Sequence, residues 1–261
     1  MELGYVRSGG YLLWWAALGR ELPFTTGGSR SEVVIEPRGI HFFLLLTLSI
    51  PPSRTEPVIA SPAKLLFLPG ASGNTRFWHP VAERLAHPAQ QVHIGWPGFG
   101  DTPPLPGVTG MDDLVARVLA EIDRPTALVA QSMGGIVAVL AALERPELIT
   151  HLTLTVTSGG VDMSALGAHD WRPDFAAANP TLPSWFLDDR TDLTLRLVEL
   201  RMPVLLLWGD SDLISPVRVG QRLAQLLPRA ELHVFPGADH SLGFTHAAEV
   251  ARLIERHLAC G

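Results

Sequence analysis

The segment ALVAQSMGGIVAVLAAL, residues 127–143, decides the fold, because it places a single hydroxyl, Ser132, between two apolar runs. The first run, residues 126–131, predicts a strand buried on both faces, since such strands need not alternate polar and apolar residues. The second run, residues 133–143, is long enough to predict a buried helix. The serine is therefore predicted to lie where a strand turns directly into a helix.

A serine in this position matches the nucleophile elbow, G-x-S-x-G, which lifts the serine Oγ above the end of a sheet. Here the motif is A-Q-S-M-G, with Ala130 in the first glycine position. Gly134 and Gly135 follow the serine and let the helix approach the strand without side chains between them. A serine before a helix is also a common N-cap, so Ser132 alone does not establish a nucleophile.

The chain from residue 64 onward alternates short apolar runs with longer helical patterns. This alternation predicts a mostly parallel central sheet with helices on both faces, an α/β fold. The predicted strands are residues 64–68, 91–96, 126–131, 151–157, 203–209 and 231–236. The predicted helices are residues 75–86, 111–122, 133–143, 217–227 and 246–258.

Two regions interrupt the alternation. Residues 158–190 are rich in Gly, Pro, Asp and Trp, and we interpret them as a short lid insertion between residues 63–157 and 191–261, which form the core. Residues 1–62 have no clear pattern beyond possible strands at 32–36 and 41–49, and they end in a proline-rich connection. This first segment either contributes the first strands of the sheet or lies outside it.

Composition excludes several classes of protein. The 261 residues carry a net charge of -6, with 19 arginines and one lysine scattered along the chain, so no basic patch for nucleic acid is expected. The apolar runs are too short to span a bilayer, and no signal-peptide pattern is evident. The single cysteine, Cys260, and the histidine spacing suggest no disulfide or metal site. We therefore expect a cytoplasmic protein without a metal.

A serine nucleophile needs a base, and the base needs an orienting acid. The predicted strand at 203–209 is followed by GDSDLISP, which offers Asp210 and Asp212. The predicted strand at 231–236 is followed by a glycine-containing loop with His240. The chain order Ser, Asp, His is the order that the nucleophile-elbow architecture requires.

These motifs together resemble the α/β-hydrolase superfamily, in its branch of small, lidded, serine esterase-like enzymes, from about residue 63 to the C-terminus. The resemblance implies that Asp212, three residues after the glycine that ends its strand, is the acid. It also implies that His240, in a G-x-x-H turn, is the base. Asp210 remains an alternative acid, and so does Asp162, because some members of the family carry their acid after the preceding strand.

The resemblance also implies an oxyanion hole made of two backbone N–H groups. Met133 follows the nucleophile and provides one. By its position in the family's motif, Ala71 provides the other N–H group, although Pro69-Gly70 stands here where the family has His-Gly. Gly70 is expected to line the substrate pocket, while Trp78 and the loop at residues 95–104 are interpreted as structural.

The insertion suggests an apolar substrate, because it carries large aromatic residues and few cations. Its aromatic residues either roof the pocket or form a small core of their own; they are Trp171, Phe175, Trp185 and Phe186. We expect cleavage of an ester-like bond of a small molecule through an acyl-enzyme, without a cofactor. A lyase or carbon–carbon bond hydrolase with the same triad, and a slow-turnover receptor, are the alternatives. The sequence leaves the natural substrate and the oligomeric state open.

Overall fold

The computed structural model describes residues 2–8, 11–17, 60–183 and 185–259 of the chain. The chain divides into two units, residues 1–57 and residues 58–261. In the first unit, β1 (Glu2–Ser8) pairs antiparallel with β2 (Tyr11–Ala17). The sequence analysis missed this pair of strands, although the Gly9-Gly10 dipeptide between two seven-residue runs is a hairpin signal. The possible strands at 32–36 and 41–49 lie outside the described residues.

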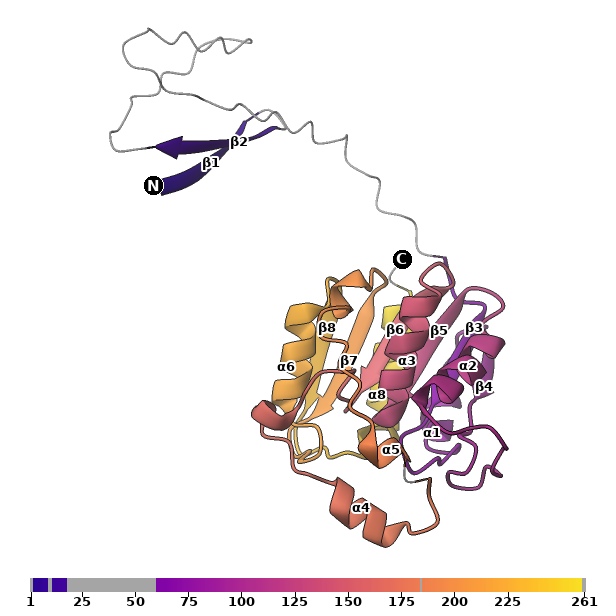
Figure 1. Cartoon of the computed structure of the whole chain (residues 1–261). Helices are drawn as coiled ribbons and strands as arrows, with labels where there is room; N and C mark the ends of the chain where they lie inside the picture. Colours follow the sequence, from indigo (N-terminus) through magenta and orange to yellow (C-terminus); the bar gives the residue numbers. More distant parts are fainter. Residues whose placement is uncertain (1, 9–10, 18–59, 184, 260–261) are drawn as a thin grey trace, which may run out of the picture. The chain divides into compact units, whose positions relative to one another are not determined.

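The second unit is built on a six-stranded parallel sheet in the order β4-β3-β5-β6-β7-β8 (Figure 1). This confirms the predicted fold class. The strands are β3 (Lys64–Leu68), β4 (Gln90–His93), β5 (Thr126–Gln131), β6 (Ile149–Thr155), β7 (Val204–Gly209) and β8 (Ala230–Phe235). Parallel strands place all their carboxyl ends at one edge, so the loops that leave β3, β5, β6, β7 and β8 meet there.

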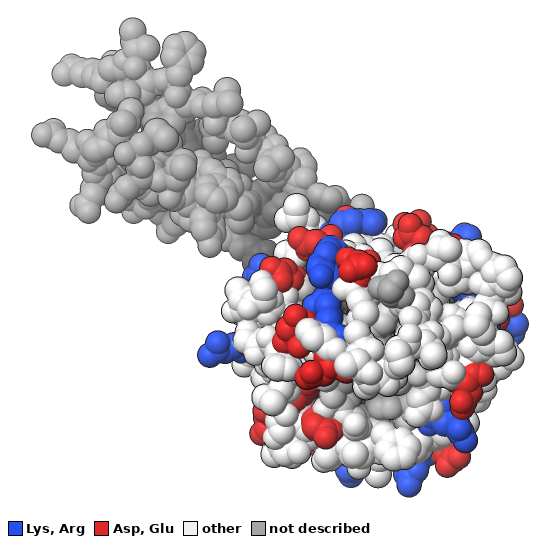
Figure 2. Space-filling view, turned by 60° about the horizontal axis from the view of Figure 1, so that its bottom comes forward, with Lys and Arg blue, Asp and Glu red and all other residues white. Residues whose placement is uncertain are grey.

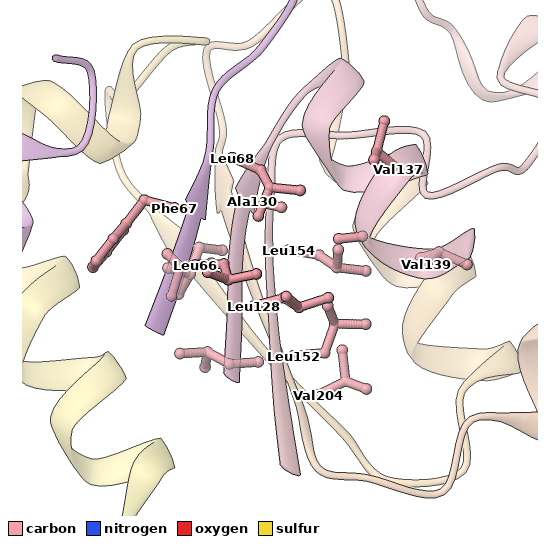
Figure 3. Packing of buried hydrophobic residues seen from close by; sticks show 14 of the residues in the cluster. Leu66, Phe67, Leu68, Leu128, Ala130, Val137, Val139, Leu152, Leu154 and Val204 are labelled. Carbon is pink, nitrogen blue, oxygen red and sulfur yellow. The ribbon is translucent and has the colours of Figure 1, made fainter. Parts of the chain in front are cut away.

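The strand register aligns apolar side chains across the four inner strands. Leu66 of β3 pairs with Leu128 of β5, Leu128 pairs with Leu152 of β6, and Leu152 pairs with Val204 of β7. All four side chains are buried, and Figure 3 shows them beside Val137 and Val139 of the neighbouring helix. The edge strands β4 and β8 are partly exposed. A core that crosses four strands holds the loop ends of those strands in fixed relative positions.

Helices cover both faces of this sheet. The helix α2 (Met111–Glu121) packs on α3 (Met133–Glu144), while α1 (His79–Ala82) packs on α8 (Ala247–Leu258). Figure 1 shows α3 in front of the sheet and α8 behind it. The helix α6 (Val217–Leu226) covers β7 and β8, and the short α7 (Leu242–Thr245) precedes α8.

The first predicted helix is much shorter than expected. The sequence pattern predicted a helix over residues 75–86, but α1 contains only four residues, His79–Ala82. Asn74 accepts a hydrogen bond from the Arg76 backbone amide, which forms a turn that competes with helix. Pro80 then lies in the first turn of α1, a position that suits a residue without an N–H.

The predicted insertion contains three short helices and no strand among its described residues. They are η1 (Ser164–Leu166), α4 (Arg172–Ala178) and α5 (Trp185–Asp188). Figure 1 shows α4 and α5 beyond one end of the sheet, next to the loops that follow the strands. A further 3-10 turn, η2 (Leu197–Glu199), leads into β7. In the described part of the chain, no helix has the length and apolar character needed to cross a membrane.

Candidate active site

Ser132 lies at the turn between β5 and α3, in a backbone conformation that few residues adopt. Its φ is 53° and its ψ is -124°. A positive φ on a residue other than glycine costs free energy, and such strained residues cluster at functional sites. The Ser132 side chain forms no capping hydrogen bond with α3. The alternative role of Ser132 as an N-cap therefore does not account for its hydroxyl.

The two glycines after the serine permit close packing of the elbow. A Cβ on Gly134 would lie 2.5 Å from the Pro69 carbonyl oxygen, and a Cβ on Gly135 would lie 2.4 Å from the Thr157 hydroxyl oxygen. Neither position has room for a side chain. The start of α3 therefore packs tightly against both the loop that leaves β3 and the end of β6.

Ser132, His240 and Asp212 form one hydrogen-bonded chain. His240 Nε2 is 3.0 Å from Ser132 Oγ, and His240 Nδ1 is 2.8 Å from Asp212 Oδ2. An ionised carboxylate only accepts hydrogen bonds, so Nδ1 carries the ring proton and Nε2 faces the serine hydroxyl with its lone pair. The His240 side chain is 24% exposed and that of Asp212 is 1% exposed. The serine and the imidazole are accessible, whereas the carboxylate is not.

The Asp212 carboxylate is held by its own loop. Its Oδ1 accepts hydrogen bonds from the backbone amides of Ile214 at 2.8 Å and Ser215 at 3.1 Å, which leaves Oδ2 for His240. The two alternative acids have other partners. Asp210 accepts from the Gly237 amide and the Ser211 hydroxyl.

Asp162 caps the turn at Ser164, where hydrogen bonds from the Ser164 amide and hydroxyl hold the pKa of this exposed carboxyl below its usual value. Asp162 is therefore engaged in its own turn. Of the three candidate acids, the structure brings only Asp212 to the histidine.

The loop after β3 lies directly beside the serine. A Cβ on Gly70 would be 3.0 Å from the Ser132 Cβ and 2.3 Å from Gln131 Oε1. The backbone amides of Ala71 and Met133 form no hydrogen bond in the described part of the chain. Met133 follows the serine in the chain and Ala71 follows Gly70, so two backbone amides near Ser132 are left without a partner among the described residues, as an oxyanion hole would require.

Two buried tryptophans donate hydrogen bonds to the backbone at the start of this loop, a feature that the sequence analysis missed. Trp78 Nε1 donates to the Leu68 carbonyl at 3.0 Å, and Trp96 Nε1 donates to the Pro69 carbonyl at 2.9 Å. Both indoles are at most 1% exposed. The structural interpretation of Trp78 and of the loop at 95–104 agrees with these bonds. The two indole hydrogen bonds stabilise the segment in which Pro69 stands where the α/β-hydrolase superfamily has a histidine.

Gln131, the residue before the serine, is a second residue that sequence reasoning missed. It is 6% exposed, and its Nε2 donates to the His240 carbonyl at 3.3 Å. Its Oε1 faces Gly70. One buried side chain therefore joins the loop that carries Ala71 to the loop that carries the imidazole. The signal in the sequence was a polar residue at the end of an otherwise apolar strand.

The aromatic residues of the insertion pack on one another. Trp171 stacks on Phe186 with ring centroids 5.8 Å apart, and Phe175 meets Phe186 edge-on at 5.6 Å. Phe99, from the loop after β4, contacts Phe186 at 5.4 Å and Trp185 at 5.8 Å. Phe186 is 5% exposed, so it is the centre of this aromatic cluster. The cluster anchors the insertion to the core through Phe99.

The surroundings of the insertion carry little positive charge. Figure 2 shows a broad area of uncharged side chains on this side of the molecule, with charged residues mainly around it. Arg172 and Arg190 both donate to the Leu187 carbonyl. Among the described residues, no group of three His, Cys, Asp or Glu side chains could hold a metal ion.

Two surface hollows lie away from the triad. One, of about 450 Å³, is lined by α8 and Arg84, and the other, of about 410 Å³, is lined by α2 and residues 105–108. Neither contains a triad residue. The hydrogen bonds around Ser132, rather than surface depth, identify the candidate site.

Comparison with known proteins identifies the family of this chain. A sequence model described as the alpha/beta hydrolase family matches residues 65–196, and one described as the alpha/beta hydrolase fold matches residues 183–247. The chain belongs to the alpha/beta hydrolase family. The matched residues of these two models include Ser132, Asp212 and His240.

Curated relatives of this alpha/beta hydrolase include esterases and carbon–carbon hydrolases. The pimeloyl-[acyl-carrier protein] methyl ester esterase of Aliivibrio salmonicida is 25% identical over 240 residues, which cover 74% of this chain and 91% of that protein. The 2-hydroxy-6-oxononadienedioate/2-hydroxy-6-oxononatrienedioate hydrolase of Burkholderia vietnamiensis is 26% identical over 241 residues, covering 71% and 82%.

Among solved structures, a lipase-esterase related protein from Clostridium acetobutylicum matches with a TM-score of 0.63 and 17% identity, covering 76% of this chain and 95% of that one. At this level of identity, the match establishes the fold and not the substrate.

Proposed function

We propose that this alpha/beta hydrolase is a serine hydrolase that cleaves an ester-like bond of a small, largely apolar substrate through an acyl-enzyme. The observation that carries the proposal is the continuous hydrogen-bonded chain from Ser132 through His240 to Asp212. A serine hydroxyl is a weak nucleophile unless an adjacent base takes its proton, and this chain supplies both the base and the group that orients it.

In the first half of the reaction, Ser132 Oγ bonds to the substrate carbonyl carbon while its proton passes to His240 Nε2. The carbonyl oxygen becomes an oxyanion and accepts hydrogen bonds from the amides of Met133 and Ala71. When the intermediate collapses, the bond to the leaving alcohol breaks and His240 returns the proton to the alcohol oxygen. Asp212 stabilises the imidazolium ion throughout.

In the second half, water repeats the same steps on the acyl-enzyme. His240 takes a proton from the water as its oxygen bonds to the acyl carbon, and the oxyanion again lies at the two amides. Collapse breaks the bond to Ser132 Oγ, which regains its proton from His240, and the carboxylic acid leaves. The substrate, one water molecule and these side chains balance the two half-reactions.

The insertion supports an apolar substrate. In this proposal, residues 158–190 act as a lid over the core formed by residues 63–157 and 191–261. The aromatic cluster lies at the end of the sheet that carries Ser132, and its large rings favour an apolar acyl or alcohol group. The pocket roles of Gly70, Trp171, Phe175, Trp185 and Phe186 belong to this proposal.

A carbon–carbon bond hydrolase is the second candidate. It is favoured by the 26% identity to the Burkholderia vietnamiensis enzyme, whose name describes hydrolysis of a 2-hydroxy-6-oxo dienoic diacid. The same serine and imidazole serve both reactions. The two candidates differ in the bond that breaks and in the polarity that the pocket must offer.

Pre-steady-state kinetics with p-nitrophenyl butyrate test the proposal. We expect a burst of about one p-nitrophenolate per enzyme in the intact chain, and a loss of at least about 10³-fold in turnover in Ser132→Ala. Ser61→Ala, which removes an exposed serine, is the matched control and should retain full activity.

Other outcomes would contradict the esterase. Activity only on a 2-hydroxy-6-oxo dienoate would favour the carbon–carbon hydrolase. Tight binding of a small ligand, with turnover far below the typical enzyme rate of about 10 per second, would favour a receptor. Equal activity of Ser132→Ala and the intact chain would rule out a serine mechanism.

A further inference from the structure

The backbone is strained at two neighbouring points of the sheet. Within the described part of the chain, Ser132 and Val156 are the residues other than glycine with a positive φ, at 53° and 43°. Val156 is fully buried and β-branched, and such residues rarely adopt this conformation. Backbone strain of this kind persists only where surrounding contacts impose it. The contacts made by the residues next to Val156 therefore indicate which part of the structure depends on this strained conformation.

The residues on either side of Val156 both bind the backbone of Ser132. The Ser132 amide donates to the Thr155 carbonyl at 3.0 Å. The Thr157 hydroxyl donates to the Ser132 carbonyl at 2.6 Å. The turn at Val156 thus allows the end of β6 to hold both polar groups of the Ser132 backbone.

The orientation of the Thr157 hydroxyl is fixed. Besides donating to Ser132, it accepts a hydrogen bond from the Gly159 amide at 3.0 Å. Thr157 is 1% exposed and lies so close to Gly135 that a Cβ there would be 2.4 Å from the hydroxyl oxygen. Tight packing and two hydrogen bonds leave this side chain little freedom.

The same threonine is joined to the loop that carries Asp212. The Ser215 hydroxyl donates to the Thr157 carbonyl at 3.1 Å and accepts from Trp208 Nε1 at 3.2 Å. The Ser215 amide donates to Asp212 Oδ1 at 3.1 Å. Ser215 is 1% exposed and Trp208 is fully buried. A hydrogen-bonded path through buried side chains therefore runs from the Ser132 carbonyl through Thr157 and Ser215 to the Asp212 carboxylate.

We propose that Thr157 is a positioning residue that, through Ser215, fixes the Ser132 backbone relative to the Asp212 loop. This inference rests on the proposed function, because it assigns Thr157 a role in the reaction of Ser132. Thr157 contacts neither the serine hydroxyl nor the imidazole. It acts by holding the serine backbone in the strained conformation that aims Oγ at His240. Small displacements of a nucleophile are costly, since a shift of about 1 Å can cost about 100-fold in rate.

The matched control is at the other end of β5. The Thr126 hydroxyl donates to the Arg124 carbonyl at 2.7 Å, and Thr126 is fully buried. Thr126→Val and Thr157→Val each remove a hydroxyl that donates to a backbone carbonyl, through the same change in shape, and Thr157→Val also removes the acceptor of the Gly159 amide. Thr157→Ser keeps the hydroxyl and removes a methyl group.

The experiment measures the rate at which a fluorophosphonate labels Ser132, together with kcat and KM for p-nitrophenyl butyrate. We expect Thr157→Val to lower the labelling rate and kcat by about 10-fold or more while KM stays within about twofold. Thr126→Val should lose thermal stability but keep both rates, and Thr157→Ser should restore most of the rate that Thr157→Val loses. Ser215→Ala should lower both rates by a smaller factor, and it tests the path even if Thr157→Val does not fold.

Equal labelling rates in the intact chain, Thr157→Val and Ser215→Ala would overturn the inference. So would a loss of rate in Thr126→Val as large as that in Thr157→Val, because the effect would then be one of general stability. If the intact chain itself is not labelled, the proposed function fails first, so the two failures are distinguishable.

Discussion

Acid should destabilise this protein through the buried histidine His257. The ring of His257, in the last turn of α8, meets the ring of His151 edge-on at 5.1 Å. Burial is the largest cause that lowers the pKa of His257 from an ordinary 6.5 to about 3, and the neighbouring His151 lowers it further. A hydrogen bond with the Leu152 backbone acts in the opposite direction and raises this pKa. Nε2 of His257 is buried and has no partner in the described part of the chain. The folded state therefore holds His257 neutral.

The sign and size of the effect follow from proton linkage. Between pH 6.5 and about pH 3 the unfolded chain binds a proton at residue 257 and the folded chain does not, so the free energy of unfolding falls as pH falls. Each pH unit below 6.5 is worth about 1.4 kcal/mol. From pH 7.5 to pH 5.0 the loss is about 2 kcal/mol. The size of this loss depends mainly on the pKa of His257 in the unfolded chain, because pH 5.0 lies well above its pKa in the folded chain.

Urea unfolding followed by circular dichroism at 222 nm measures this loss, because the described helices all belong to the second unit. We expect His257→Leu to lose about 2 kcal/mol less stability than the intact chain between these two pH values. His169→Gln removes a histidine whose side chain is 64% exposed, and it should follow the intact chain. The same fall in all three proteins would refute the assignment to His257.

Three further predictions concern the loop beside the serine and the core. Gly70→Ala places a Cβ 2.3 Å from Gln131 Oε1 and 3.0 Å from the Ser132 Cβ, so the Gln131 side chain or the loop that carries Ala71 must move, and kcat for an ester should fall by about 100-fold with a smaller change in KM. Trp96→Phe leaves the buried Pro69 carbonyl without its 2.9 Å donor, and urea unfolding should show a loss of about 1–3 kcal/mol with a lower kcat. Leu128→Ala, at a fully buried position, should cost about 2–5 kcal/mol in the same unfolding assay and leave KM unchanged in the folded fraction.

Each of these has a result that contradicts it. Unchanged kcat in Gly70→Ala would mean that the loop does not hold the oxyanion. Unchanged stability and kcat in Trp96→Phe would mean that the indole does not brace the loop. A loss below about 1 kcal/mol in Leu128→Ala would contradict the tight packing of the strand row seen in Figure 3.

The fold was predictable because its signals are local. Continuous apolar runs mark strands that are covered on both faces, and the helices between them require parallel strands. The six strands of the parallel sheet fall within a few residues of the predicted ones, whereas the pair β1 and β2 was missed. A further exception is the first helix, α1, where the side chain of Asn74 and the position of Pro80 outweigh a weakly helical pattern. Such competition between side chains and backbone is hard to read from spacing alone.

The candidate site was predictable in outline and not in detail. Chain order and the loops after the strands pointed to Ser132, His240 and a nearby aspartate. The choice among Asp210, Asp212 and Asp162 from the residues alone stayed open, since all three follow strands. The bracing roles of Trp96, Gln131 and Thr157 were not foreseen, because each side chain binds a backbone group far away in sequence.

The sequence by itself determined the six strands of the parallel sheet and the helices α2, α3, α6 and α8, and it placed a single serine between β5 and α3. Tertiary structure decided which side chains meet: His240 reaches Asp212 across 28 positions and Ser132 across 108. It also decided that Trp185 and Phe186 of the insertion pack on Phe99. The physical reason is that propensity and periodicity act over a few neighbours, whereas these contacts exist only after the sheet has brought distant strand ends to one edge.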